Sequence, residues 1–216
     1  MDKRIILDTA TPEEIMKIII SDKDFLFNKI IEDCKRYIHI VKSRADKRRV
    51  FFTTHKGNRG LTYSLIYISK SKRDSIKNNL IWIAYTYYQT RNGYNTVLLS
   101  SIDRGKESFV FYNSHFFDRY RERELKDETL SKPETIKEFF KENSISIHHP
   151  LENSSNPNGI FCVFKNNGVG LGEELSGNCI ILKTYISTEM LKEGQVELHE
   201  KTLSRIKQLI VLNNKD

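Results

Sequence analysis

One short segment of the chain combines the residue types that acid–base chemistry on a phosphate requires. His115, Arg119 and Arg123 stand four residues apart. On a helix, residues four apart lie one above the other, so these side chains are expected along one stripe. Histidine titrates near neutral pH, and arginine stays charged and donates a planar fork of hydrogen bonds to phosphate oxygens. The pattern therefore predicts a site for a phosphate-containing substrate.

Cleavage of RNA without a metal is the reaction that these side chains suit. The ribose 2′-hydroxyl must lose a proton before it attacks its own phosphorus, and His115 is the expected base or acid. The phosphate gains negative charge in the transition state, which Arg119 and Arg123 would stabilise. No metal or other cofactor is expected. The plainer alternative is a structural role in ion pairs with nearby acids, namely Asp118, Glu122 and Glu124.

The HxxxRxxxR pattern of residues 115–123 resembles the first helix of small toxin-like proteins related to RelE and ParE. These belong to the barnase–EndoU–colicin–RelE group of ribonuclease-like folds. In members with this motif, antiparallel strands follow the helix, and the last strand often ends in a Thr-aromatic pair, which residues 184–185 match. The resemblance implies a ribonuclease core of one helix and a sheet at about 109–186. The catalytic residues that it implies are His115, Arg119, Arg123, Thr184 and Tyr185.

Positive charge is concentrated in another segment. The chain has 35 Lys and Arg against 28 Asp and Glu, a formal net charge of +7. Between residues 42 and 59, seven basic residues are accompanied by Asp46 alone. Such a block predicts an anionic partner. The predicted nucleic-acid contacts are Lys47, Arg48, Arg49, Lys56 and Arg59 from this block, and Lys183 beside the Thr-aromatic pair.

Several alternatives to an RNA-cleaving enzyme stay open at this point. The protein can be a non-enzymatic nucleic-acid-binding or partner-binding protein of a phage or mobile element, in which the basic block matters and His115 does not. The basic block can also meet an acidic antitoxin or inhibitor protein. The least specific reading of the block is a solvated helix end followed by a hairpin.

Composition limits the class of protein. The 216 residues suit one domain of about 100–200 residues or one with an appendage. The chain has 29% charged and 11% aromatic residues, and this composition rules out a disordered tail protein. No apolar run approaches the ~20 residues that cross a bilayer, and the N-terminus is too polar for a signal peptide. The odd number of cysteines, at Cys34, Cys162 and Cys179, fits neither a disulfide framework nor a zinc site. A cytoplasmic protein without membrane contact is therefore expected.

The first half of the chain predicts two helices followed by strands. Thr11 to Glu14 reads as a capping box that opens a short helix through Ile20. A longer helix follows, with apolar residues at helical spacing. Its expected core positions are Phe27, Ile30, Ile31, Cys34, Tyr37, Ile38 and Val41. Strands are predicted at 50–54, 61–69, 80–90, 95–102 and 108–112, separated by turn signals such as Asn92-Gly93.

The second half mixes helices and strands. Helices are predicted at about 115–124, from the capping box at Ser131 to about 143, and at about 195–211. Strands are predicted at 160–165 and 178–186, joined by a glycine-rich connection. The expected fold is α+β, with an N-terminal helical segment at 1–49, then an α+β domain at 50–216 built on a largely antiparallel sheet and ending in a helix.

Three further patterns receive a structural interpretation. The adjacent His148 and His149 are read as part of a surface loop at 148–159 rather than as metal ligands, because no cysteine or carboxylate cluster stands at ligand spacing. The segment from Gly168 to Gly172 is read as a connection between strands rather than as a dinucleotide-binding loop, because no helix follows it. His55 is read as a turn residue rather than as part of an anion site.

Overall fold

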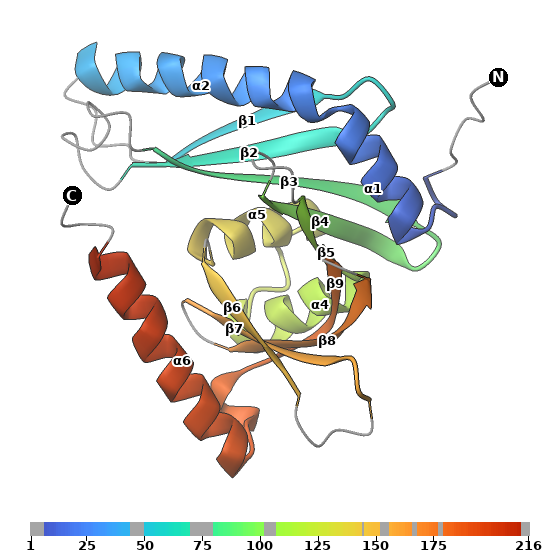
Figure 1. Ribbon diagram of the computed structural model, residues 1–216, viewed down its shortest axis with the longest axis vertical. Coiled ribbons are helices and arrows are strands. Elements are labelled where there is room, and N and C mark those ends of the chain that lie inside the picture. The colour runs from blue at the N-terminus through green and yellow to red at the C-terminus, as the bar shows by residue number, and fades with distance from the viewer. Residues whose placement is uncertain are drawn as a thin grey trace. The chain divides into compact units, whose positions relative to one another are not determined.

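The computed structural model describes the chain at residues 7–43, 50–69, 80–101, 107–143, 145–151, 156–165, 168–176 and 179–212. The chain divides into two compact units, Met1–Phe109 and Val110–Asp216 (Figure 1). Helices and mainly antiparallel strands make up both units, which confirms the α+β class. The division expected at residue 49 falls inside the first unit, because the N-terminal helices pack on the strands that follow them.

Two helices open the first unit. α1 (Pro12–Ser21) begins at the predicted capping box: the backbone N–H of Thr11 donates to the Glu14 carboxylate (3.0 Å), and the Glu14 N–H donates to the Thr11 hydroxyl (3.3 Å). These two bonds satisfy N–H groups that the start of a helix leaves unpaired. α2 (Lys23–Ser43) follows directly and runs along the sheet of this unit (Figure 1).

The buried face of α2 differs from the expected one. Phe27 and Ile31 are 41% and 38% exposed, so their predicted core positions are wrong. The residues of α2 that are buried are Leu26, Ile30, Asp33, Tyr37 and Val41. Their spacing of three and four residues is that of one helix face. A search for apolar residues alone does not find Asp33 on this face.

Four antiparallel strands form the meander of the first unit in the order β1-β2-β3-β4. They are β1 (Val50–Lys56), β2 (Thr62–Ile68), β3 (Ile81–Thr90) and β4 (Gly93–Ser101), each within two residues of its predicted ends. Side chains alternate between the two faces of a strand. One face of β1 therefore carries Phe51, Thr53 and His55, and Tyr37 of α2 stacks on Phe51 with ring centroids 4.3 Å apart.

The helices of the second unit begin as expected. α4 (Ser114–Tyr120) passes directly into a π-helical turn, η1 (Arg121–Leu125). α5 (Lys132–Glu142) starts at its predicted capping box, where the N–H and the hydroxyl of Ser131 donate to the Glu134 carboxylate at 2.9 and 2.6 Å. α4 contacts both α5 and the last strand of the unit.

Strands of the second unit follow the order β5-β9-β8-β7-β6, and β6 to β9 pair antiparallel. Their bounds are β5 (Ser108–Tyr112), β6 (Ser146–Pro150), β7 (Gly159–Phe164), β8 (Val169–Ser176) and β9 (Cys179–Ile186). Two predictions are corrected here. His148 and His149 lie in β6 rather than in a loop, and the glycine-rich segment is strand β8 rather than a connection.

Glycine occurs within β8 because its neighbours approach closely. A Cβ atom on Gly170 would lie 3.2 Å from the ring of Phe116 in α4, and one on Gly172 would lie 1.9 Å from the carbonyl oxygen of Ile181 in β9. Gly172 stands at a shift in the register between β8 and β9. Glycines that resemble turn signals in the sequence thus leave the room that α4 and β9 need to approach β8.

A cluster of buried aromatic rings joins α4, α5 and the strands. Most of its pairs are edge-on, at centroid distances of about 5 to 6 Å, the arrangement that aromatic quadrupoles favour. The cluster consists of Tyr112, Phe116, Phe117, Tyr120, Phe139, Phe140, Phe164 and Tyr185. The C-terminal helix α6 (Glu193–Leu212), predicted at 195–211, packs a separate apolar face with Ile206 against Phe161 and Val163 of β7.

Candidate functional site

α4 presents His115 and Arg119 to solvent. The helix starts at Asn113, whose side chain accepts a hydrogen bond from the N–H of Phe116 (3.0 Å), and Phe116 and Tyr120 anchor its inner face in the aromatic cluster. His115 and Arg119 are exposed on the other side, one helical turn apart. No hydrogen bond or ion pair joins His115 to any residue that the structure describes. Its imidazole is therefore available to a substrate.

The π-helical turn alters the position of Arg123. The backbone N–H of Lys126 donates to the carbonyl of Arg121 at 2.9 Å, an i to i+5 bond. Such a turn contains more residues than an α-helical one, so each residue rotates less about the axis. The regular α-helical spacing from Arg119 therefore does not continue to Arg123. Lys126 ends the turn in the left-handed region, with φ of 51°.

Arg123 and the Thr-aromatic pair meet, but through the backbone of the strand. The half-buried guanidinium of Arg123 donates to the carbonyl oxygen of Tyr185 at 2.5 Å. Tyr185 itself is fully buried, and its hydroxyl donates to Glu124 at 2.9 Å. Burial and the Glu124 carboxylate raise the pKa of Tyr185 well above its ordinary value. Tyr185 therefore holds η1 on β9 and does not reach the surface, while the neighbouring Thr184 is half-buried.

Arg119 carries an ion pair that a phosphate can replace. Its guanidinium donates to the Glu122 carboxylate at 2.6 Å, and the two side chains are 45% and 61% exposed. Exposed pairs of this kind contribute about 0–1 kcal/mol. Asp118, another expected partner, pairs instead with Lys132 and more distantly with Arg121. An ion pair with a nearby acid, the alternative to a catalytic role, is therefore formed by Arg119 and not by His115.

The predicted nucleic-acid contacts lie in several places. Lys47, Arg48 and Arg49 lie outside the described residues. Lys56 ends β1 and is exposed on the face opposite to His55, and Arg59 is exposed in the following turn. Lys183 is half exposed on β9 and pairs with Glu173 of β8 at 2.6 Å. The two predicted sets belong to different units, apart from Lys183.

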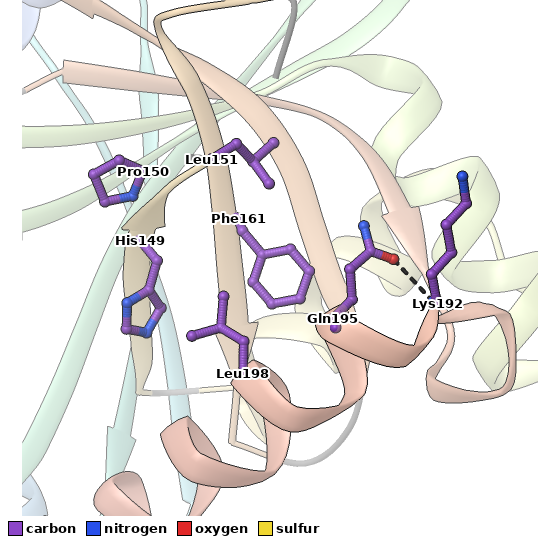
Figure 2. A pocket seen from close by; sticks show the side chains of 8 residues that line it. His149, Pro150, Leu151, Phe161, Lys192, Gln195 and Leu198 are labelled. Carbon is purple, nitrogen blue, oxygen red and sulfur yellow. Dashed lines mark hydrogen bonds between the residues drawn. The ribbon is translucent and has the colours of Figure 1, made fainter. Parts of the chain in front are cut away.

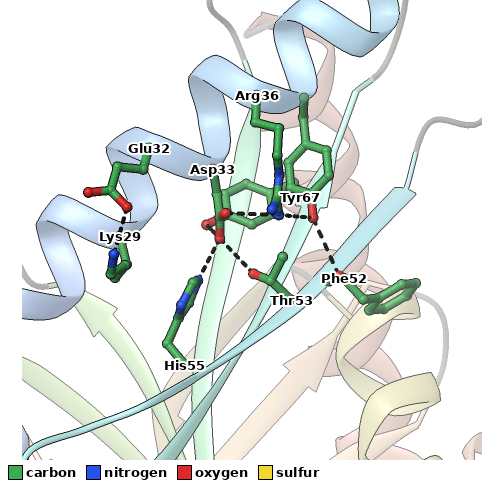
Figure 3. A network of polar contacts seen from close by, with 9 residues as sticks. Lys29, Glu32, Asp33, Arg36, Phe52, Thr53, His55 and Tyr67 are labelled. Carbon is green, nitrogen blue, oxygen red and sulfur yellow. Dashed lines mark hydrogen bonds and ion pairs between the residues drawn. The ribbon is translucent and has the colours of Figure 1, made fainter.

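The first unit contains a buried polar network that was not predicted from the sequence. Asp33 of α2 is 5% exposed, and its carboxylate has four side-chain partners (Figure 3). Oδ2 accepts hydrogen bonds from Thr53 at 2.7 Å, His55 at 2.7 Å and Tyr67 at 3.1 Å, and Oδ1 forms an ion pair with Arg36 at 2.9 Å. One turn of α2 and two neighbouring strands thus meet at a single buried charge.

The network keeps Asp33 ionised. Burial alone would raise the pKa of Asp33, but the bonds from His55 and Thr53 and the charge of Arg36 outweigh it and leave the pKa below its ordinary value. Burial raises the pKa of the adjacent Cys34 thiol to about 11, so Cys34 is not a reactive thiolate at neutral pH. A signal for Asp33 does exist in the sequence: it lies on the apolar helix face between Ile30 and Tyr37.

A pocket of about 470 Å³ opens in the second unit between β6 and the start of α6 (Figure 2). Phe161, Leu151 and Leu198 form its apolar part, and His149, Lys192 and Gln195 add polar groups. The polar groups are partly engaged: Nε2 of His149 lies 2.8 Å from the Thr202 hydroxyl, and the Lys192 N–H donates to the Gln195 side chain at 3.0 Å. None of the predicted catalytic residues lines this pocket.

Comparisons with protein-family models, with curated proteins and with solved structures found no match to this chain. Among the described residues, no three His, Cys, Asp or Glu side chains gather in a way that would hold a metal ion. In the same part of the chain, no helix has both the length and the apolar character needed to span a membrane.

Proposed function

We propose that the second unit is a metal-independent endoribonuclease that acts on RNA through His115, Arg119 and Arg123. The observation that carries the proposal is the exposed imidazole of His115, without an internal partner among the described residues and one turn from the exposed Arg119. A base must be free of internal partners to take a proton from a substrate. The net charge of +7 favours a polyanionic substrate such as RNA.

In the proposed reaction, His115 accepts the proton of the ribose 2′-hydroxyl while the 2′-oxygen attacks the adjacent phosphorus. The bond from phosphorus to the 5′-oxygen of the next nucleotide breaks, and that oxygen takes up a proton from water. The imidazolium of His115 then gives its proton to the hydroxide that remains, which regenerates the base. The products are a 2′,3′-cyclic phosphate and a free 5′-hydroxyl. Arg119 and Arg123 neutralise the charge that develops on the phosphate oxygens, a contribution of roughly 10²–10³-fold in rate for one well-placed donor.

The surroundings of the two arginines support this role. One guanidinium nitrogen of Arg123 donates to the Tyr185 carbonyl. This bond fixes the guanidinium and leaves its other N–H groups for a phosphate. Arg119 exchanges an exposed carboxylate, Glu122, for the substrate at little cost. The order of elements supports the proposal in part: α4 precedes antiparallel strands, the last of which, β9, contains Thr184 and Tyr185, although α5 lies between α4 and these strands.

Single substitutions on α4 test the proposal. We expect His115→Ala to lower kcat on a fluorescent single-stranded RNA about 10²–10⁴-fold, the usual contribution of a general base. Arg119→Ala should lower kcat/KM by roughly 10²-fold, because it removes charge stabilisation. Cleavage is measured in EDTA, and the product ends are examined for a 2′,3′-cyclic phosphate. An RNA with 2′-deoxyribose at every position should resist cleavage.

Matched variants separate the site from general effects of charge and folding. His39→Ala removes another exposed histidine, in the first unit, and Arg205→Ala removes another exposed arginine, on α6. Both should leave kcat/KM within about twofold, since surface substitutions away from the site have small effects. Equal losses in His39→Ala and His115→Ala, or RNA cleavage that survives His115→Ala, would contradict the proposed role of His115.

One observation favours a second candidate function, RNA binding without cleavage. His115 is the single proton-transferring side chain on the exposed stripe of α4, and Arg119 is already paired with Glu122. A protein that only binds RNA would retain it at low salt and leave it intact. In that case His115→Ala would change neither the length of the RNA nor its affinity.

A further inference from the structure

We infer that Arg36 and His55, both held by Asp33, form a binding site in the first unit for a phosphate group of single-stranded RNA. The inference depends on the proposed function only for the choice of RNA as the source of the phosphate. Arg36 and His55 lie far from α4 in the sequence. Sequence analysis interpreted His55 as a turn residue and did not single out Arg36.

Arg36 is both fixed and accessible. Its guanidinium forms an ion pair with Asp33 and donates to the Tyr37 hydroxyl, each at 2.9 Å. Its central carbon lies 4.9 Å from the centre of the Tyr37 ring. The side chain is nevertheless 55% exposed. An arginine carries five N–H donors, so several stay available to an anion. Because the guanidinium is already held in place, an anion that binds it loses little further side-chain entropy.

His55 is oriented by the same carboxylate. Its Nε2 lies 2.7 Å from Oδ2 of Asp33, whereas its Nδ1 has no partner among the described residues. The side chain is 19% exposed on the edge strand β1, and it approaches Oδ2 of Asp33 whereas Arg36 approaches Oδ1 (Figure 3). When the imidazole is protonated, Nε2–H donates to Asp33 and Nδ1–H is left to donate to an anion.

A purely structural role accounts for less of this arrangement. A buried ion pair contributes little net stability compared with apolar packing, and the seam between α2 and β1 already has the stacked rings of Tyr37 and Phe51. Thr53 and Tyr67 alone could satisfy Oδ2 of Asp33. Attachment of α2 requires neither an arginine that reaches solvent nor a histidine with one nitrogen left over. An anion that approaches this edge uses both.

Charge around the site favours an anion. The charged groups of α2 drawn with the imidazole in Figure 3 are Asp33, Arg36 and the ion pair of Lys29 with Glu32 (2.7 Å). The titratable groups of β2 are Tyr63 and Tyr67, whose pKa values burial raises so that they stay neutral. Lys35 is exposed on the next position of α2. A phosphodiester oxygen accepts the charge-assisted hydrogen bonds that a guanidinium and an imidazolium donate, and these are stronger than neutral ones.

The experiment measures RNA binding in a background that cannot cleave. All variants carry His115→Ala, and the anisotropy of a fluorescent single-stranded RNA is titrated at several salt concentrations. We expect Arg36→Gln to weaken binding about tenfold, in line with a hydrogen bond to a charged group, and to reduce the salt slope by about one contact. Lys35→Gln removes the same charge one residue away and should weaken binding less than twofold.

His55→Gln supplies a second arm that preserves the fold, because the glutamine amide can still donate to Asp33. Its RNA affinity should be lower than that of the protein with His55, because the glutamine leaves no second donor in the place of Nδ1. Thermal unfolding confirms that each variant is folded. Equal effects of Arg36→Gln and Lys35→Gln, or unchanged binding in both Arg36→Gln and His55→Gln, would overturn the inference.

Inorganic phosphate distinguishes this failure from a failure of the proposed function. If RNA does not bind at low salt but phosphate shifts the imidazole NMR signals of His55 and not those of His39, the anion site stands and its source is a smaller phosphate compound. The choice of RNA and the ribonuclease proposal then fail together. If neither RNA nor phosphate affects His55, the site itself is refuted.

Discussion

At the scale of single residues, a buried carboxylate with three hydrogen-bond donors and one ion-pair partner stabilises the fold only while it is charged. Asp33 has a pKa below its ordinary value, so it contributes stability above the unfolded pKa of about 3.9 and loses that contribution as the pH falls through the folded value. Asp33→Asn should lower the free energy of unfolding at pH 7 by about 3 kcal/mol, because three donors lose a charged acceptor. Urea unfolding at pH 7 and pH 3 should show the difference shrinking in acid.

The exposed Asp24 provides the matched control for this prediction. Asp24→Asn makes the same chemical change in the first turn of α2, where a carboxylate contributes only about 0.3–1 kcal/mol through the helix dipole. A loss in Asp33→Asn no larger than that in Asp24→Asn would show that the network is not coupled to folding. If the loss of unfolding free energy in Asp33→Asn grew as the pH fell, the pKa of Asp33 would be raised in the folded protein and not lowered.

Individual residues also show where sequence reasoning about a site succeeds and where it stops. The spacing of His115 and Arg119 was enough to place both on an exposed helix face, because helical periodicity is local. Asp33 and His55 are separated by 22 positions, and their contact depends on how α2 lies on β1. Nothing in the spacing of Tyr185 indicated that its ring is buried while its carbonyl holds Arg123.

At the scale of elements, strand β8 depends on a glycine that no other residue can replace without movement. A Cβ atom at Gly172 would lie 1.9 Å from the Ile181 carbonyl oxygen, which is backbone and cannot rotate away. We expect Gly172→Ala to destabilise the protein by about 1–3 kcal/mol, the range for an overpacked site. The measurement is urea unfolding of the whole chain.

Gly194 in α6 should respond with the opposite sign to the same change. A Cβ atom there meets nothing within 4 Å, so Gly194→Ala fits and should stabilise the helix by up to about 1 kcal/mol. If both alanine variants shift stability in the same direction, the close approach at Gly172 is not what limits β8.

Elements with strong local signals were predicted well, and those defined by tertiary contact were not. Both capping boxes and the Asn92-Gly93 turn fix element ends through neighbouring residues, so α1, α5 and the β3–β4 hairpin match their predictions. β8 was missed because glycines usually interrupt strands, whereas here they admit α4 and β9. β6 was missed because its histidines and proline resemble a loop, and only its pairing with β7 makes it a strand.

At the scale of the whole molecule, the net charge of +7 predicts how RNA binding depends on salt. A protein that neutralises phosphates releases their counterions, and log K falls by about 0.7 per contact as log salt rises on a single strand. With Arg119 and Arg123 in one unit and Arg36 and His55 in the other, at least four contacts are expected. The slope for single-stranded RNA, measured by anisotropy, should therefore be about −3 or steeper.

The variants divide this slope between the two units. Arg36→Gln and Arg119→Ala should each reduce it by about 0.7, and the double variant by about twice as much, because sites without shared partners act additively. His115→Ala should leave the slope almost unchanged, because the proposed base contacts the 2′-hydroxyl and not a phosphate oxygen. A slope near zero for the intact chain would mean that the positive charge does not serve RNA binding, and an unchanged slope in the double variant would place the contacts on other residues.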